Sequence, residues 1–317
     1  MNNTASDTKY IIVGIDGTGS GSWRKADGSN SHIYQFVRDF QYGAMGIDKK
    51  FFDGPSDSVS GRESEAILQR ALDFIMHRLS VLFPQIRNGN IHPLDMYDVN
   101  SCMQASEQTT MGYMNGYSYF TSYATRLPVR VTPQMLARQP FHHNQVRIIL
   151  AGHSRGGLVV ANLARMLSPV AQVYFMALYD SVDRQPCLDG AVVENAKYVF
   201  HARRHPDVHS RNMFSNTSTQ YKSEYHEERF FYTSHGGIGG SFVSNYSEMT
   251  MFGDDSCIVK PDTVTITDGM GTPVTIDNIN PLTKKFHKPI DQICSEGSDE
   301  ADRFIREGAK RFGLPIH

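Results

Sequence analysis

The chain has 317 residues, of which 40% are hydrophobic and 20% charged, the balance of an ordinary soluble globular protein with a sizeable core. A formal net charge of -2 gives no electrostatic basis for binding nucleic acid or an acidic membrane surface. No apolar run approaches the roughly 20 residues that span a bilayer, and the first residues do not resemble a signal peptide. We therefore expect a protein made in the cytoplasm, whose export, if it acts outside the cell, uses a system independent of signal peptides.

The four cysteines, Cys102, Cys187, Cys257 and Cys294, are far apart and form no CxxC pair. This spacing predicts neither a zinc site nor a disulfide scaffold. Lone thiols are typical of a reducing compartment, although the sequence is also compatible with one or two disulfides. We expect no metal and no cofactor.

The first predicted element is a buried parallel strand over residues 10–15, which ends in the turn Asp16-Gly17-Thr18-Gly19. Residues 24–60 are rich in Gly, Asp and Ser and are interpreted as loop with short elements. The capping box Ser60-Gly61-Arg62-Glu63 begins a helix that we expect to run to about Phe83.

An aromatic cluster lies in the first of two predicted insertions, residues 84–144. The spacing of Tyr113, Tyr117 and Phe120 predicts one face of a helix over residues 111–123. We expect this face to bind substrate as an apolar cap, although such clusters are also typical of ordinary core.

Strands and helices alternate through much of the remaining chain, which predicts an α/β fold with a mostly parallel sheet and helices on both faces. We expect one domain over residues 1–317, with a second insertion near residues 247–290. The further predicted strands are 146–151, 173–178, 197–200 and 229–233, the helices are 156–167 and 299–312, and 263–267 pairs with 274–276 in a hairpin.

Gly152-His153-Ser154-Arg155-Gly156 fits the pattern G-x-S-x-G between a predicted strand and a predicted helix. This context is that of a nucleophile elbow, a sharp turn that lifts a serine hydroxyl clear of the sheet. Glycines at positions 152 and 156 allow close backbone approach. The sequence therefore predicts Ser154 as a nucleophile.

An activated serine needs a histidine base and an orienting acid, in the chain order serine, acid, histidine. Asp180 and His235 each follow a predicted strand, so both are expected at the carboxyl edge of the sheet. Asp183, three residues after Asp180, is the rival acid. The backbone N–H of Arg155 and that of Gly17 or Thr18 are the expected oxyanion donors.

Two other patterns carry weaker hypotheses. The loop after the first strand resembles a phosphate-binding loop, but Ser22 stands where G-x-G-x-x-G needs its third glycine. His201, His205 and His209 recur every four residues, which on a helix would form a metal-binding face. Pro206 interrupts such a helix, so we interpret this stretch as a polar loop.

Several motifs together resemble one family, the α/β hydrolases that form the catalytic domain of type VI secretion phospholipase effectors. The matching residues are Asp16-Gly17-Thr18, Gly152-His153-Ser154-Arg155-Gly156, Asp180-Ser181-Val182, His235 and Ile238-Gly239-Gly240. The resemblance implies a Ser154–His235–Asp180 triad, a phospholipid or other lipid ester as substrate, and transient contact with a membrane surface.

The sequence thus favours a serine esterase of the lipase or phospholipase type, acting on a small-molecule or lipid ester. A hydrolase of soluble esters, thioesters or peptides is the second hypothesis. A non-catalytic binding protein with an α/β-hydrolase-like fold is the third.

Overall fold

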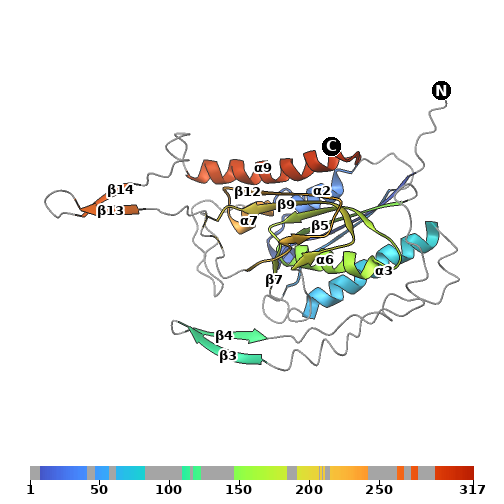
Figure 1. The fold of residues 1–317 in the computed structure, drawn as a ribbon, viewed down its shortest axis with the longest axis horizontal. Coiled ribbons are helices and arrows are strands. Elements are labelled where there is room, and N and C mark those ends of the chain that lie inside the picture. Colours follow the sequence, from blue (N-terminus) through green and yellow to red (C-terminus); the bar gives the residue numbers. More distant parts are fainter. Residues whose placement is uncertain are drawn as a thin grey trace.

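The computed structural model contains one large sheet with helices packed against it, together with several two-stranded pairs (Figure 1). It describes residues 8–40, 47–56, 62–82, 109–114, 117–122, 146–183, 191–206, 208, 210, 215–241, 263–267, 273–277 and 290–317. Among these residues, no helix combines the length and the apolar character needed to cross a membrane.

The large sheet has the strand order β12-β9-β6-β5-β1-β2, and all neighbouring strands in it run parallel. The predicted α/β class is therefore confirmed. The strand order reverses between β1 and β5, the point at which open α/β sheets place their ligand sites. The strands are β1 (Lys9–Ile15), β2 (Ile47–Phe52), β5 (Val146–His153), β6 (Val173–Tyr179), β9 (Ala196–Arg204) and β12 (Tyr225–Phe231).

Helices cover both faces of this sheet (Figure 1). α2 (His32–Arg38) and α9 (Ile290–Arg311) pack on one face, while α3 (Arg62–Leu82) and α6 (Arg155–Leu167) pack on the other. Central strands are therefore buried on both sides, which explains their continuous apolar sequences.

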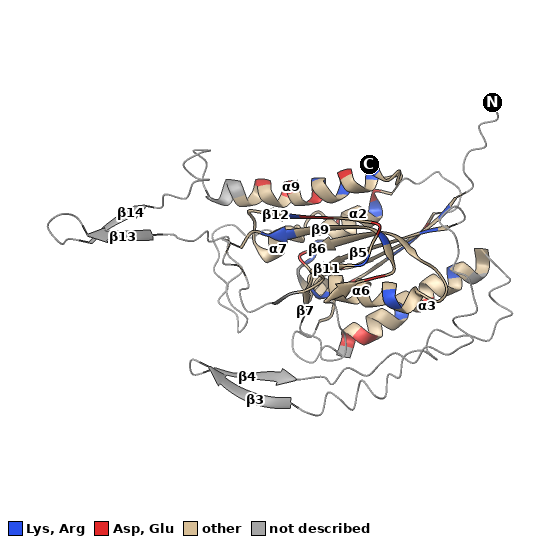
Figure 2. Ribbon diagram, viewed as in Figure 1, with Lys and Arg blue, Asp and Glu red and all other residues tan. Residues whose placement is uncertain are grey.

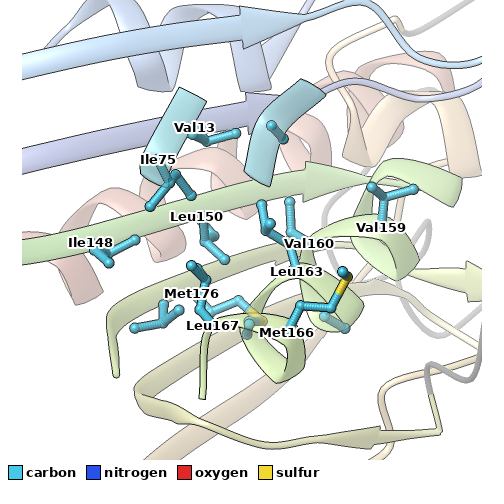
Figure 3. Close-up of a cluster of buried hydrophobic side chains, with 14 of the residues drawn as sticks. Val13, Ile75, Ile148, Leu150, Val159, Val160, Leu163, Met166, Leu167 and Met176 are labelled. Atoms are coloured by element: carbon cyan, nitrogen blue, oxygen red, sulfur yellow. The ribbon is translucent and has the colours of Figure 1, made fainter. Parts of the chain in front are cut away.

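Side chains alternate between the two faces along each strand. In β5, Ile148 and Leu150 belong to the core under α3 and α6, whereas Ile149 and Ala151 belong to the core under α2 and α9. Figure 3 shows Ile148 and Leu150 beside Ile75 of α3 and the apolar residues of α6.

The closing helix α9 is amphipathic, with Phe304 and Ile305 in the core and both signs of charge along its length (Figure 2). It begins earlier than residues 299–312 predict and is followed by Gly313, whose φ of 71° is the left-handed conformation expected after a helix end.

The remaining elements are short. α1 (Ser20–Trp23) follows the turn after β1, and α7 (His235–Ile238) begins at a predicted site residue. The two-stranded pairs are β3 (Thr109–Met114) with β4 (Tyr117–Ser122), β7 (Val182–Asp183) with β10 (Ser215–Asn216), β8 (Val192–Val193) with β11 (Gln220–Tyr221), and β13 (Thr263–Thr267) with β14 (Pro273–Asp277).

The second insertion contains the predicted hairpin, since β13 pairs antiparallel with β14. The helix predicted over residues 111–123 is wrong, because β3 and β4 form an antiparallel hairpin there, with Met111 opposite Phe120 and Met114 opposite Tyr117. Two residues, Asn115 and Gly116, separate these strands, and this pair is the one favoured in two-residue hairpin turns.

Residues 24–60, interpreted as loop with short elements, contain the short elements α2 and β2. β2 reads IDKKFF, whose polar residues are tolerated because β2 is an edge strand. The Ser31 side chain caps α2 by accepting a hydrogen bond from the Tyr34 N–H at 3.1 Å. The capping box before α3 and the single-domain boundary lie partly outside the described residues and stay predictions.

Cys294, buried in α9, is disulfide-bonded. The sequence is compatible with one or two disulfides, and Cys294 takes part in one. The sequence separation of the cysteines gives no information on pairing, because folding brings together residues that are far apart in the chain.

Candidate active site at the carboxyl edge of the sheet

Ser154 occupies a strained turn between β5 and α6, with φ 55° and ψ -126°. Gly152 and Gly156 allow this turn to pack tightly. A Cβ atom at Gly152 would overlap the carbonyl oxygen of Gly156, and one at Gly156 would overlap that of Ile15. These contacts are those of a nucleophile elbow packed against the end of β1.

Ser154, His235 and Asp180 form one hydrogen-bonded chain. Ser154 Oγ lies 2.9 Å from Nε2 of His235, and Nδ1 of His235 lies 2.7 Å from Oδ2 of Asp180. All three side chains are buried. The arrangement places a base against the serine hydroxyl and a carboxylate against the base, in the geometry of a Ser-His-Asp triad.

The structure distinguishes between the two candidate acids. Asp180 follows β6 with a positive φ of 46° and carries the carboxylate that contacts His235. Asp183 lies in β7, where its backbone pairs with Ser215 of β10.

Charge and burial have opposite effects on the pKa of Asp180. Burial alone would raise the pKa of Asp180, but the guanidinium of Arg204 and the hydrogen bond from His235 outweigh it and hold that pKa well below its usual range. Burial is also the main influence on His235, whose pKa is lowered even though Asp180 acts in the opposite direction. At neutral pH, His235 is therefore a neutral imidazole that can accept a proton.

The turn after β1 reaches the nucleophile. Gly17 lies so close that an added Cβ would be 3.3 Å from Cβ of Ser154. The Gly17 N–H donates to Oδ1 of its neighbour Asp16 at 2.7 Å, so this amide is already engaged. Which N–H of this turn would face the oxyanion, that of Gly17 or that of Thr18, stays a prediction, as does the role of Arg155 at the start of α6.

A buried polar cluster supports this turn and was not predicted from the sequence. Oδ2 of Asp16 accepts a 2.6 Å hydrogen bond from Ser31, the residue that caps α2. His153 lies between Gly17 and Gly239, and its Nε2 is 3.1 Å from the carbonyl oxygen of His235. The cluster connects β1, β5 and the histidine turn at the point where the serine sits.

The histidine turn is held from several elements. The His235 N–H donates to Oγ of Ser210 at 2.7 Å, and Ser298 of α9 donates to the carbonyl oxygen of Gly237 at 2.5 Å. Nδ1 of His32 in α2 lies 3.0 Å from the carbonyl oxygen of Ile238. These contacts fix the backbone that carries the base.

Strand β9 contributes two further side chains. Arg204 contacts the Asp180 carboxylate, and His201 accepts a 3.1 Å hydrogen bond from the Ser181 N–H through its Nε2. Burial, helped by nearby Arg203, lowers the pKa of His201 to about 4. The interpretation of this stretch as polar loop is wrong for residues 201–204, because they belong to a strand and their polar groups are buried.

The predicted substrate-binding residues Tyr113, Tyr117 and Phe120 lie on the β3–β4 hairpin, and their side chains are outside the described part of the chain. Within that part, no group of three or more His, Cys, Asp or Glu residues could hold a metal ion. A polar hollow of about 530 Å³ between α2 and α9 includes His32 and Arg306 but not Ser154.

No family model matches the chain, and no curated protein matches it. Among solved structures, it is similar to an uncharacterized protein from Pseudomonas aeruginosa, with 14% sequence identity and a TM-score of 0.39. The match covers 73% of this chain and 41% of that one, so this chain spans about two fifths of the other's length.

Proposed function

We propose that the protein is a serine hydrolase that cleaves carboxylic esters through an acyl-enzyme. The observation that carries this proposal is the hydrogen-bonded chain from Ser154 through His235 to Asp180, set on a strained turn where the strand order reverses. A serine in a structural role has no need of a strained backbone or of a buried base against its hydroxyl.

In the first step, Oγ of Ser154 attacks the ester carbonyl carbon while its proton passes to Nε2 of His235. The carbonyl electron pair moves to oxygen, which we expect the N–H groups of Arg155 and of Gly17 or Thr18 to stabilise. The C–O bond to the alcohol then breaks, and His235 returns the proton to the leaving oxygen. A water molecule then attacks the acyl-enzyme by the same steps, and the carboxylic acid product is released.

Asp180 keeps its negative charge throughout and stabilises the imidazolium that forms at each proton transfer. Its lowered pKa supports this role, because the carboxylate stays ionised at neutral and mildly acidic pH. A neutral His235 supports the role of base in the same way.

For the substrate, we propose a lipid or phospholipid ester, on the basis of the sequence motifs shared with phospholipase effectors. The disulfide at Cys294 supports action outside the reducing cytoplasm, where such bonds persist. This agrees with a protein that acts on membrane lipids outside the cytoplasm.

The first test is labelling by a fluorophosphonate, which reacts only with an activated serine. We expect the wild-type protein to be labelled at Ser154 and Ser154→Ala to be unlabelled, as measured by intact-mass spectrometry. Absence of labelling in the folded wild-type protein would contradict the proposal. Hydrolysis of micellar against monomeric short-chain esters then tests the lipid class, since a lipid hydrolase prefers the micellar substrate.

A further inference from the structure

Arg204, the last residue of β9, binds the candidate acid Asp180 next to His235. Its side chain is only 7% exposed. Nη1 contacts Oδ2 of Asp180, the same oxygen that faces Nδ1 of His235, and the backbone N–H of Arg204 donates to Oδ1 at 3.4 Å. One residue therefore holds both oxygens of the carboxylate.

A triad does not need this cation in order to work. The acid has to orient the histidine and stabilise the imidazolium, and its full negative charge does this best. A guanidinium on the shared oxygen offsets part of that charge, and Nη1 is also only 3.3 Å from Nδ1 of His235. Both effects act against a positive charge on His235.

We propose that Arg204 is a positioning residue of the site: it fixes the Asp180 carboxylate and, by offsetting its charge, allows His235 to accept the serine proton in mildly acidic solution. This inference rests on the proposed function. It predicts that the protein is active at lower pH than an Asp–His pair without a neighbouring cation would allow.

Burial and one neighbouring ring act on the pKa of His235 in the same direction as Arg204. Of the described neighbours, Asp180 favours the protonated ring, and His153, with its ring centroid 5.0 Å away, disfavours it. Asp16 lies beyond His153, with Oδ1 3.7 Å from Nδ1 of that ring. His32 contacts the α7 backbone at Ile238. Arg204 is thus the only permanent cation among these groups.

The experiment measures the rate of fluorophosphonate labelling of Ser154 from pH 4.5 to 9, which follows the unprotonated fraction of His235. For the wild-type protein we expect the half-maximal rate below about pH 6.5, the ordinary value for histidine. In Arg204→Gln the half-maximal pH should rise by about one unit. Arg204→Lys, which keeps the charge, should stay within a few tenths of a unit of wild type.

Arg203→Gln is the matched control, because it removes the same charge from the neighbouring position of β9. Arg203 pairs with Glu228 at 2.8 Å and does not contact the triad. Its half-maximal pH should equal that of wild type. A wild-type value at or above about pH 7, or equal values for Arg204→Gln and Arg203→Gln, would overturn the inference.

Failure of the proposed function has a different signature, namely no labelling of Ser154 at any pH. In that case, titration of the His235 ring by NMR in Ser154→Ala and in Ser154→Ala/Arg204→Gln still tests the role of Arg204. The double variant should titrate about one unit higher. Should Arg204→Gln not fold, Arg204→Lys decides, because a half-maximal pH more than a few tenths of a unit from that of wild type would overturn the inference.

Discussion

The two sides of the site contribute in different ways. On the β1–β5 side, backbone geometry dominates: the Ser154 turn is strained, and Gly156 allows it to lie against the end of β1. On the β9 side, charged and polar side chains dominate, with Arg204 on the acid and His201 on the amide that follows it. We therefore expect changes on the first side to abolish function, and changes on the second to produce graded effects that depend on pH.

The largest effect should come from Ser154→Ala, which removes the nucleophile and leaves the turn able to form. We expect turnover of a reactive ester to fall by at least about 10⁵-fold, because the remaining groups cannot act without the serine. Steady-state kinetics on the folded variant measures this, with circular dichroism as the control for folding. Substantial residual turnover would mean that another group performs the reaction.

The acid should have the next largest effect. Asp180→Asn is expected to lower kcat by about 10⁴-fold, since the amide cannot hold His235 in the tautomer that accepts the serine proton. Asp183→Asn is the matched control and should cost far less, because Asp180 already occupies the position against Nδ1 of His235. A reversed ranking of the two kcat values would show that Asp183 is the acid.

The comparison of the two sides also explains which features could be predicted from the sequence. The strands that carry Ser154 and Asp180 are continuous apolar runs buried on both faces, and the elbow has a local pattern. Both signals are contained in a few consecutive residues. The central strands and the candidate residues Ser154 and Asp180 could therefore be predicted from the sequence, whereas the contact that favours Asp180 over Asp183 appears only in the structure.

The β9 side gives no such local signal. Its strand ends in the polar sequence His201-Ala202-Arg203-Arg204, which is buried only because Asp180 and Glu228, distant in sequence, pair with the two arginines. α2 is similar, since its start is fixed by the contact of Ser31 with Asp16. Polar groups that are satisfied by distant partners look like loop residues in the sequence.

A third region, the hairpin of β3 and β4, can be tested for a role in binding the acyl chain of the substrate. If β3 and β4 cover the site, Tyr117→Ala and Phe120→Ala should each remove about 1–3 kcal/mol of binding free energy for medium-chain esters. This loss lowers kcat/KM by up to about a hundredfold. Acetate esters should be nearly unaffected, because one methyl group makes little apolar contact. Equal losses on both substrates would indicate a structural role, and no loss on either would place the hairpin away from the site.

His201 should have the smallest effect, and it should appear in stability. His201 is fully buried and its pKa is lowered to about 4, so the unfolded chain binds a proton there at pH 5 whereas the folded protein does not. The free energy of unfolding is therefore expected to fall on acidification, between the ordinary histidine pKa and about pH 4. From pH 7 to pH 5 this one group should account for about 2 kcal/mol, equivalent to roughly a thirtyfold change in the folding equilibrium.

Urea unfolding of wild type and His201→Gln at the two pH values measures this contribution. Glutamine can still accept the hydrogen bond from the Ser181 N–H but does not titrate, so the variant should lose about 2 kcal/mol less than wild type on acidification. Because other groups titrate in both proteins, the difference between the two losses isolates His201. Equal losses would mean that His201 does not remain neutral and buried in the folded protein. In that case the hydrogen bond that holds the backbone after Asp180 would need another explanation.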